Sequence, residues 1–345
     1  SSIAMKLFKD LSGKIIAVLL GAAILIPVYY TIHSVCLYNK GYDSESDKTA
    51  NINVMLKRPD NWYQIDMSGI NLPIKTKDMR LIDGSTATVP ITAEIARQFL
   101  GISDEELNEN METYINHNTT GKAYQNLIQG SSKDGDECHL LFATEPSDEE
   151  LAEAEENNVK LIVEPVALDG FVFIVNKDNP VDSLTVSQIQ DIYSGKITNW
   201  KEVGGKNCKI TAFQRERNSG SQTAMENLVM KDKKLMEATE KWYVQTMSLL
   251  IENVAEYNNS KESIGYTYNY YINNLYKNDN IKVLKIDGIT ADKENLISGA
   301  YPFTTSYNII TRDDETKAEV SMIHDFILSD KGQEMIELAG YCPVR

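Results

Sequence analysis

The pattern of apolar and polar residues changes twice along the chain. One long apolar run lies near the N-terminus, a polar stretch follows it, and from residue 79 onward short apolar runs alternate with amphipathic segments of helical period. Such alternation of strands and helices is typical of an α/β fold. The expected strands cover residues 79–82, 137–143, 161–166, 170–175, 208–213, 281–286 and 307–311. The expected helices cover residues 90–100, 122–129, 149–157, 186–193, 223–230, 320–328 and 332–338.

The N-terminal apolar run has the composition of a membrane-spanning helix. It covers residues 15–32 and follows Lys6, Lys9 and Lys14, close to the roughly 20 apolar residues that cross a bilayer. Large residues stand where signal-peptide cleavage requires small ones, although Cys36 keeps a lipid-modified form open as the alternative. We therefore predict an uncleaved anchor over residues 1–37, with the basic end inside and the rest of the chain outside the cytoplasm.

The segment that follows the anchor is polar. Residues 38–78 contain a dense run of Gly, Asp, Ser and Glu, which is typical of a linker. Trp62 and Tyr63 indicate some local order within it. We predict a stalk here, before the folded part of the chain begins.

The charge of the chain limits the classes of partner. The 345 residues carry a formal net charge of −16, whereas nucleic-acid binding requires a basic face. We therefore expect no nucleic-acid partner. A small anion remains compatible with this charge, because local hydrogen-bond donors and helix ends hold such a ligand.

Residues that could hold a metal ion or carry out catalysis are dispersed. Cys36, Cys138, Cys208 and Cys342 show no CxxC spacing, and the four histidines are far apart. A disulfide between Cys138 and Cys342 and a set of separate thiols both fit this spacing. The chain has no GxSxG, Walker A or HExxH motif. The sequence thus predicts neither a metal, nor a cofactor, nor an enzyme.

Three clusters of Ser, Thr, Asn and Gly each precede an expected helix. They cover residues 83–88, 118–121 and 218–222. Helix capping alone explains any one of them, because these residues satisfy the first free amides of a helix. The alternative is that the amides and hydroxyls face an anion, which a helix N-terminus favours. Three such ends would surround a tetrahedral oxyanion with little need for lysine or arginine.

A guanidinium group near the third cluster distinguishes it from the other two. Arg215 lies four residues before Ser219, after the strand expected at 208–213, where it could bind two oxygens of one anion. Arg217 is the competing candidate. A surface location is the simpler interpretation for either.

Several segments, in order along the chain, resemble the phosphate-binding proteins of phosphate ABC transporters. The similarity extends from residue 81 to residue 344. Any one segment is weakly specific, but the ordered set is strongly so. The similar segments are residues 169–180, 189–200 (IQDIYSGKITNW), 215–223 (RERNSGSQT), 263–266, 298–302 and 326–344.

This resemblance implies a type 2 periplasmic-binding-protein fold, in which two α/β lobes joined by crossing strands close over the ligand. It places residues 79–165 and 267–345 in lobe 1 and residues 166–266 in lobe 2. In the second cluster the family has a glycine–serine pair, so Asn118, Thr119 and Thr120 all remain candidates for the hydroxyl. The other ligand positions that the resemblance implies are Ser85, Thr86, Ala87, Arg215, Ser219, Gly220 and Ser221.

Glu145 occupies the position where some members of that family place an aspartate against the ligand. A buried carboxylate can accept a hydrogen bond from protonated phosphate, whereas sulfate would face it with two unpaired acceptors. The alternative is an exposed glutamate before the turn at Pro146. The first interpretation predicts selection of phosphate over sulfate.

The sequence therefore predicts a monomeric, membrane-anchored receptor that binds inorganic phosphate outside the cytoplasm and delivers it to the permease subunits of an ABC transporter. Two alternatives stay open. One is an anchored sensor that does not transport, and the other is a receptor for a different oxyanion, such as sulfate or molybdate.

Overall fold

The computed structural model describes residues 56–130, 137–217, 219–238, 243–244, 247–256 and 262–345. The predicted anchor, most of the predicted stalk and Cys36 lie outside these residues. Among the described residues, no helix combines the length and apolar character needed to cross a membrane.

One sheet carries the fold of residues 56–345. Its strands follow the order β1-β2-β11-β3-β8-β5, and β12 and β9 also pair with β3. The parallel pairs are β1 with β2 and β5 with β8, whereas β3 runs antiparallel to all of its partners. These strands are β1 (Ile82–Gly84), β2 (Leu140–Ala143), β3 (Leu161–Asn176), β5 (Thr211–Ala212), β8 (Ser263–Tyr268), β9 (Ile281–Val283), β11 (Thr304–Arg312) and β12 (Cys342–Pro343).

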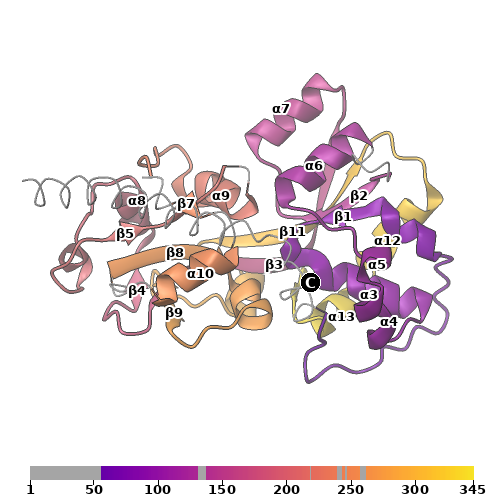
Figure 1. Cartoon of the computed structure of the whole chain (residues 1–345), viewed down its shortest axis with the longest axis horizontal. Helices are drawn as coiled ribbons and strands as arrows, with labels where there is room; N and C mark the ends of the chain where they lie inside the picture. The colour runs from indigo at the N-terminus through magenta and orange to yellow at the C-terminus, as the bar shows by residue number, and fades with distance from the viewer. Residues whose placement is uncertain (1–55, 131–136, 218, 239–242, 245–246, 257–261) are drawn as a thin grey trace, which may run out of the picture. The chain divides into compact units, whose positions relative to one another are not determined.

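The strand β3 belongs to two groups of elements (Figure 1). Its first part, up to Gly170, pairs with β11, and its last part, from Phe171, pairs with β8 and β9. We call the elements around β1, β2, β11 and β12 lobe 1, and those around β5, β8 and β9 lobe 2. The sequence predicts two separate strands here, at 161–166 and 170–175. The structure has one continuous strand, because Asp169 and Gly170 lie within the ladder.

Helices cover the sheet in both lobes. In lobe 1 they are α3 (Val89–Leu100), α4 (Asp104–Glu109), α5 (Met111–Tyr114), α6 (Thr120–Gln129), α7 (Asp148–Glu156), α12 (Ala318–Ile327) and α13 (Asp330–Leu338). In lobe 2 they are α8 (Val186–Tyr193), α9 (Gly220–Ala224) and α10 (Met247–Glu256), with α11 (Lys293–Ile297) nearer to β3. Two π-helical segments, η4 (Met225–Met230) and η7 (Tyr271–Leu275), continue the chain after α9 and β8.

Short elements complete the two lobes. The 3₁₀ helices are η1 (Thr76–Leu81), η2 (Thr86–Thr88) and η3 (Trp200–Val203). Two small sheets pair β4 (Ser183–Leu184) with β10 (Lys285–Ile286) and β6 (Gln214–Arg215) with β7 (Tyr243–Val244). The strand expected at 79–82 is mostly the helix η1, and β1 begins only at Ile82.

Two segments differ from the boundaries expected from the sequence. Residues 56–78, expected in the stalk, pack on lobe 1: Leu56, Ile65 and Ile74 are buried in its core. The guanidinium of Arg58 stacks on the Trp62 ring, 3.7 Å from its centroid. The local order that the sequence predicts around Trp62 therefore belongs to a segment that packs on lobe 1. Residues 281–286, expected in lobe 1, pair with strands of lobe 2.

Aromatic side chains fill the region where β3 passes from lobe 1 to lobe 2. Phe171, Phe173 and Tyr266 are in mutual contact, with ring centroids 5.4–6.2 Å apart. Tyr268 and Tyr307 continue the cluster toward lobe 1, with ring centroids 5.7 Å apart. Large buried rings contribute much apolar contact area, so this cluster ties the two lobes to one core.

Candidate functional site

The first Ser/Thr/Gly cluster forms the turn after β1. The amide of Ser85 donates to the Phe142 carbonyl of β2 at 3.0 Å, and the Thr88 hydroxyl lies 2.6 Å from the same carbonyl. Ser85 is buried, Thr86 is exposed and Ala87 is half-buried. The turn is therefore fixed to the end of β2, with Thr86 at its surface.

Two side chains that the sequence analysis missed hold the first turn to the second. The Asp83 carboxylate accepts from the amide and the side-chain Nδ2 of Asn118, at 2.9 and 2.8 Å. His117 Nδ1 donates to the Ser85 carbonyl at 2.8 Å, and its Nε2 accepts from the Thr92 hydroxyl at 2.7 Å. Burial lowers the pKa of His117, which favours this neutral form. These contacts join residues 25 to 35 positions apart in the sequence, and they form only after folding, so no local pattern signals them.

The structure separates the three candidates of the second cluster. The side chain of Asn118 is bound by Asp83, and Thr119 is exposed. Thr120, the first residue of α6, is half-buried and faces the third cluster: a Cβ placed on Gly220 would lie 3.1 Å from its Oγ1. Thr120 is thus the residue that brings the second cluster to the third.

The third cluster contains both a capped helix and a buried cation. The Ser219 hydroxyl caps α9 by accepting from the Gln222 amide at 3.1 Å, as the simpler interpretation expects. Arg215 is buried, and its Nη1 donates to Ser221 Oγ at 3.1 Å. Burial lowers the pKa of the Arg215 guanidinium, so a nearby anion would stabilise its charged form.

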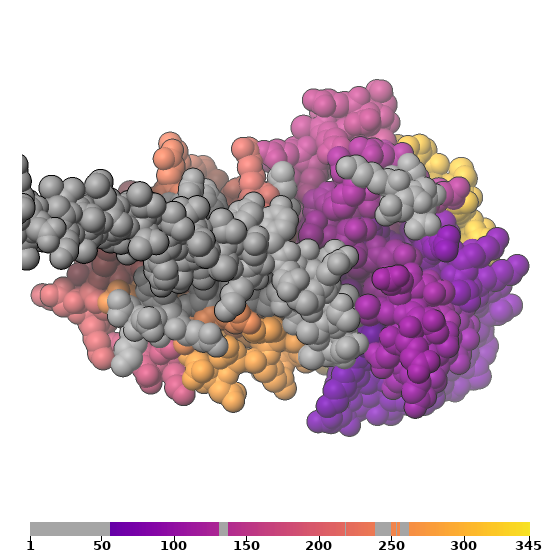
Figure 2. All heavy atoms as spheres, viewed as in Figure 1, coloured from indigo at the N-terminus to yellow at the C-terminus, as the bar shows by residue number. Residues whose placement is uncertain are grey.

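Arg217, the competing arginine, has a different environment. It is exposed and forms an ion pair with Glu149 of α7, the helix that projects from lobe 1 (Figure 2). Arg217 therefore links the outer surfaces of the two lobes, whereas Arg215 lies inside lobe 2. The position expected from the family resemblance is the buried one.

The clusters meet at the carboxyl end of β2. A Cβ on Gly220 would lie only 2.6 Å from Thr144 Oγ1, and Thr144 directly follows β2. The Tyr268 hydroxyl donates to the Gly220 carbonyl at 2.9 Å, and the Tyr124 hydroxyl donates to the Thr144 carbonyl at 2.6 Å. Ser85, which follows β1, lies beside the end of β2, because the two strands are parallel neighbours and end together. Ligands commonly bind outside the carboxyl ends of such strands.

Glu145 is close to these residues but is solvent-exposed. Its charge helps to raise the pKa values of the Tyr124 and Tyr268 phenols, for which burial is the largest cause. The hypothesis of a dry carboxylate that repels sulfate requires burial, and the structure gives Glu145 access to water. Its exposure favours the alternative interpretation of this residue.

The assembled groups are suited to bind an anion. Hydroxyl groups, the N-termini of α6 and α9, and one buried guanidinium converge from both lobes. Within the described ranges, no group of three or more His, Cys, Asp or Glu side chains is placed to hold a metal ion. Cys138, Cys208 and Cys342 are free thiols, so the separate-thiol alternative holds for these three residues.

Comparison with known proteins identifies the family. Residues 75–331 match the model of the PBP superfamily domain. The chain belongs to the PBP superfamily. Its relatives include the phosphate-binding protein PstS of Staphylococcus epidermidis, at 32% identity over 64% of this chain and 67% of the relative. The PstS of Bacillus subtilis is 26% identical over 76% of this chain and 80% of the relative. These matches confirm the resemblance inferred from the sequence.

Solved structures agree with this placement in the PBP superfamily. One is a protein from Clostridium perfringens described as a phosphate ABC transporter substrate-binding protein with bound phosphate. It matches with a TM-score of 0.57 and 27% identity over 76% of this chain and 98% of that one. An ABC-type phosphate transport receptor from Vibrio cholerae matches with a TM-score of 0.55 and 23% identity over 75% and 98%, which supports the fold. The expected type 2 periplasmic-binding-protein fold is confirmed.

Proposed function

We propose that the chain is a receptor that binds inorganic phosphate between its two lobes and supplies it to an ABC-type importer. The PstS relatives and the phosphate-bound Clostridium perfringens protein support this ligand. The proposed ligand groups come from all three clusters, and Thr120 is preferred over Thr119 because it faces Gly220. They are Ser85, Thr86, Ala87, Thr120, Arg215, Ser219, Gly220 and Ser221.

The buried guanidinium of Arg215 carries the proposal. A guanidinium inside a lobe interacts strongly with an anion, because water screens the attraction little and two parallel hydrogen bonds can form. Its pKa is lowered by burial, and it lies beside the turn whose Gly220 contacts Thr144 and Thr120 of lobe 1. A phosphate at this junction would bind to both lobes at once, so ligand binding would favour their closed arrangement.

The location and the partners form part of the proposal. The predicted anchor over residues 1–37 would hold the receptor at the outer face of the cell membrane. We expect a monomer that acts through the permease subunits of the transporter and catalyses no reaction itself. Membership of the PBP superfamily, whose relatives here are phosphate-binding proteins, supports a receptor without catalytic activity.

Calorimetric titration of the purified chain tests the proposal. We expect phosphate to bind at one site per chain, more tightly than sulfate or molybdate. Absence of phosphate binding would overturn the proposal, and release of phosphate from a phosphoester would contradict its non-catalytic part. Phosphate uptake by cells with and without the chain separates the importer from the anchored sensor, since a sensor would leave the uptake step itself unchanged.

A further inference from the structure

Thr144 is placed among the ligand groups although no sequence motif indicated it. It follows the last residue of β2, on lobe 1, and only 5% of its surface is exposed. Its Oγ1 faces the third cluster of lobe 2, since a Cβ on Gly220 would lie 2.6 Å from that oxygen. Thr120 Oγ1 approaches the same point, at 3.1 Å from that Cβ. Two hydroxyls of lobe 1 therefore meet one turn of lobe 2.

Among the described residues, the Thr144 hydroxyl makes no hydrogen bond with ordinary distance and angles. The Tyr268 phenol is the polar group beside it: an interaction with the Thr144 side chain acts to lower the pKa of Tyr268, which burial raises, and the phenol donates its own proton to the Gly220 carbonyl at 2.9 Å. The carbonyl of Thr144 itself accepts from Tyr124. A buried hydroxyl without a partner destabilises a folded protein, and such groups are rare in native structures. The position of Thr144 thus requires an explanation beyond packing.

We propose that Thr144 contacts the bound oxyanion directly and completes the ring of donors formed by Thr120, Gly220 and Arg215. The inference rests on the proposed function and adds a binding residue to that site. A hydroxyl can donate to an anion oxygen and can also accept from a protonated one. Thr144 therefore contributes affinity for phosphate and for sulfate alike, and it does not discriminate between them.

The test compares Thr144→Val, which has the same shape without the hydroxyl, with Thr144→Ser, which keeps it. Calorimetric titration with inorganic phosphate and with sulfate should show that Thr144→Val binds each about tenfold more weakly, the loss expected for one hydrogen bond to a charged group. Thr144→Ser should stay within about threefold of wild type. Ligand-free Thr144→Val should unfold at a temperature no lower than wild type, because it loses an unsatisfied group.

The outcomes separate this inference from the proposed function. Wild-type binding of phosphate together with unchanged affinity in Thr144→Val would overturn the inference alone. Equal losses in the Val and Ser variants would assign the effect to the packing of the whole side chain, not to the hydroxyl, and would overturn it too. Absence of phosphate binding in wild type would overturn both claims. Thr144→Ala serves as a second variant, and failure of both Val and Ala to fold would assign Thr144 a structural role instead.

Discussion

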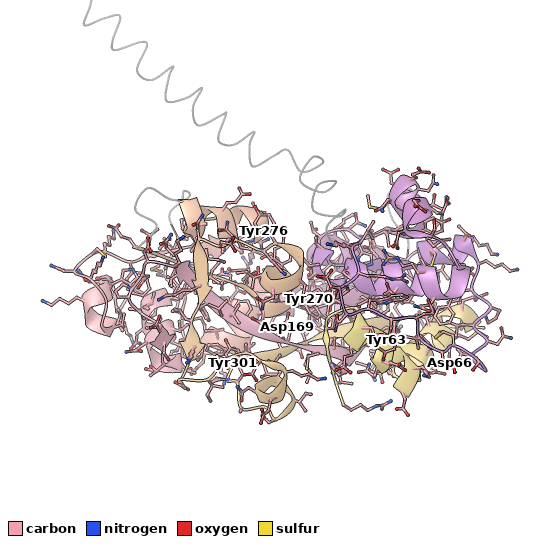
Figure 3. The ribbon with its side chains drawn as sticks, turned by 90° about the horizontal axis from the view of Figure 1, so that it is seen from below. Tyr63, Asp66, Asp169, Tyr270, Tyr276 and Tyr301 are labelled. Atoms are coloured by element: carbon pink, nitrogen blue, oxygen red, sulfur yellow. The ribbon has the colours of Figure 1, made fainter. Side chains whose placement is uncertain are left out.

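The hydroxyl of Tyr307 on β11 donates to the carboxylate of Asp169 on β3 at a distance of 2.6 Å. The amides of Gly170 and Tyr270 donate to the same carboxylate at 2.7 and 3.0 Å. Asp169 and Tyr270 lie together where β3 leaves lobe 1 (Figure 3). Asp169 thereby ties the crossing strand to the segment that follows β8. Burial raises the pKa values of five nearby phenols, and the charge of Asp169 adds to this effect; they are Tyr268, Tyr270, Tyr301, Tyr307 and Tyr341.

Asp169 makes the stability of the chain depend on pH. Burial raises its pKa to about 7, although its three donors act in the opposite direction. In the unfolded chain an aspartate ionises near pH 4, so between about pH 4 and 7 the folded state binds more protons. The free energy of unfolding should therefore fall as the pH rises through this window, by up to about 4 kcal/mol from this residue.

Asp169→Asn removes this dependence. Asparagine does not ionise, and its one carbonyl oxygen can accept either from the Tyr307 hydroxyl or from the two amides, so the variant should be less stable than wild type at low pH. Urea unfolding at several pH values should show that the variant loses the decline in stability that wild type shows between pH 4 and 7. Asp313→Asn, at an exposed aspartate, is the matched control and should leave the decline intact. A parallel pH profile for wild type and Asp169→Asn would refute the assignment.

Arg215 and Arg217 should differ sharply in their contribution to phosphate affinity. Arg215→Ala removes a buried guanidinium beside Ser221, and we expect a loss on the order of 100-fold, as for one strong hydrogen-bonded charge. Arg217→Ala breaks an exposed ion pair with Glu149, which should change the affinity less than about fivefold. Calorimetric titration of both variants measures the contrast. Unchanged affinity in Arg215→Ala would show that the third cluster is misassigned.

Glu145→Gln tests how the receptor separates phosphate from sulfate. Because the carboxylate of Glu145 is exposed, water can solvate it when sulfate is bound, and the penalty for an unpaired buried acceptor does not apply in full. We expect the ratio of the two affinities to fall by less than about tenfold in the variant. Competition titration measures this ratio. Equal binding of the two anions by Glu145→Gln would restore the carboxylate as the main selector.

Local chemistry accounts for the parts of the fold that the sequence predicted well. The helices α3 and α8 begin and end within one residue of the expected ranges, because Pro90 at the start and Gly101 at the end of α3 are local signals. Arg215 and the three clusters were found in the same way, since capping residues and a family motif stand in the sequence itself. These features can be predicted without knowing which distant parts of the chain are in contact.

The missed features depend on partners far away in the chain. Asp169 and Gly170 read as a break between two strands, but hydrogen bonds from Tyr270 and Tyr307, 101 and 138 residues away, keep them within β3. Asp83 and Thr144 acquire their roles only when β1, β2 and the third cluster come together. The local sequence around each of these residues does not indicate which distant residues it will contact.

Gly220→Ala should weaken phosphate binding by obstructing the contact between the lobes. The added Cβ would lie 2.6 Å from Thr144 Oγ1 and 3.1 Å from Thr120 Oγ1, and β-branched threonines have few other rotamers to adopt. Gly220 begins α9 and has no positive φ, so its backbone conformation suits alanine. Separation of the lobes in the ligand-free chain would relieve the contact with Thr144, and we expect the ligand-free stability to be unchanged or slightly higher. We expect a loss of at least about tenfold in affinity, from overpacking of roughly 1–3 kcal/mol.

A double-mutant cycle identifies the cause of that loss. If the clash with Thr144 is responsible, Gly220→Ala should weaken binding much less in a Thr144→Ala background than in wild type, because contacting residues couple. Small-angle scattering with and without phosphate should also show less compaction for Gly220→Ala than for wild type. Full additivity of the two substitutions, or normal compaction in the variant, would mean that Gly220 does not set the approach of the lobes.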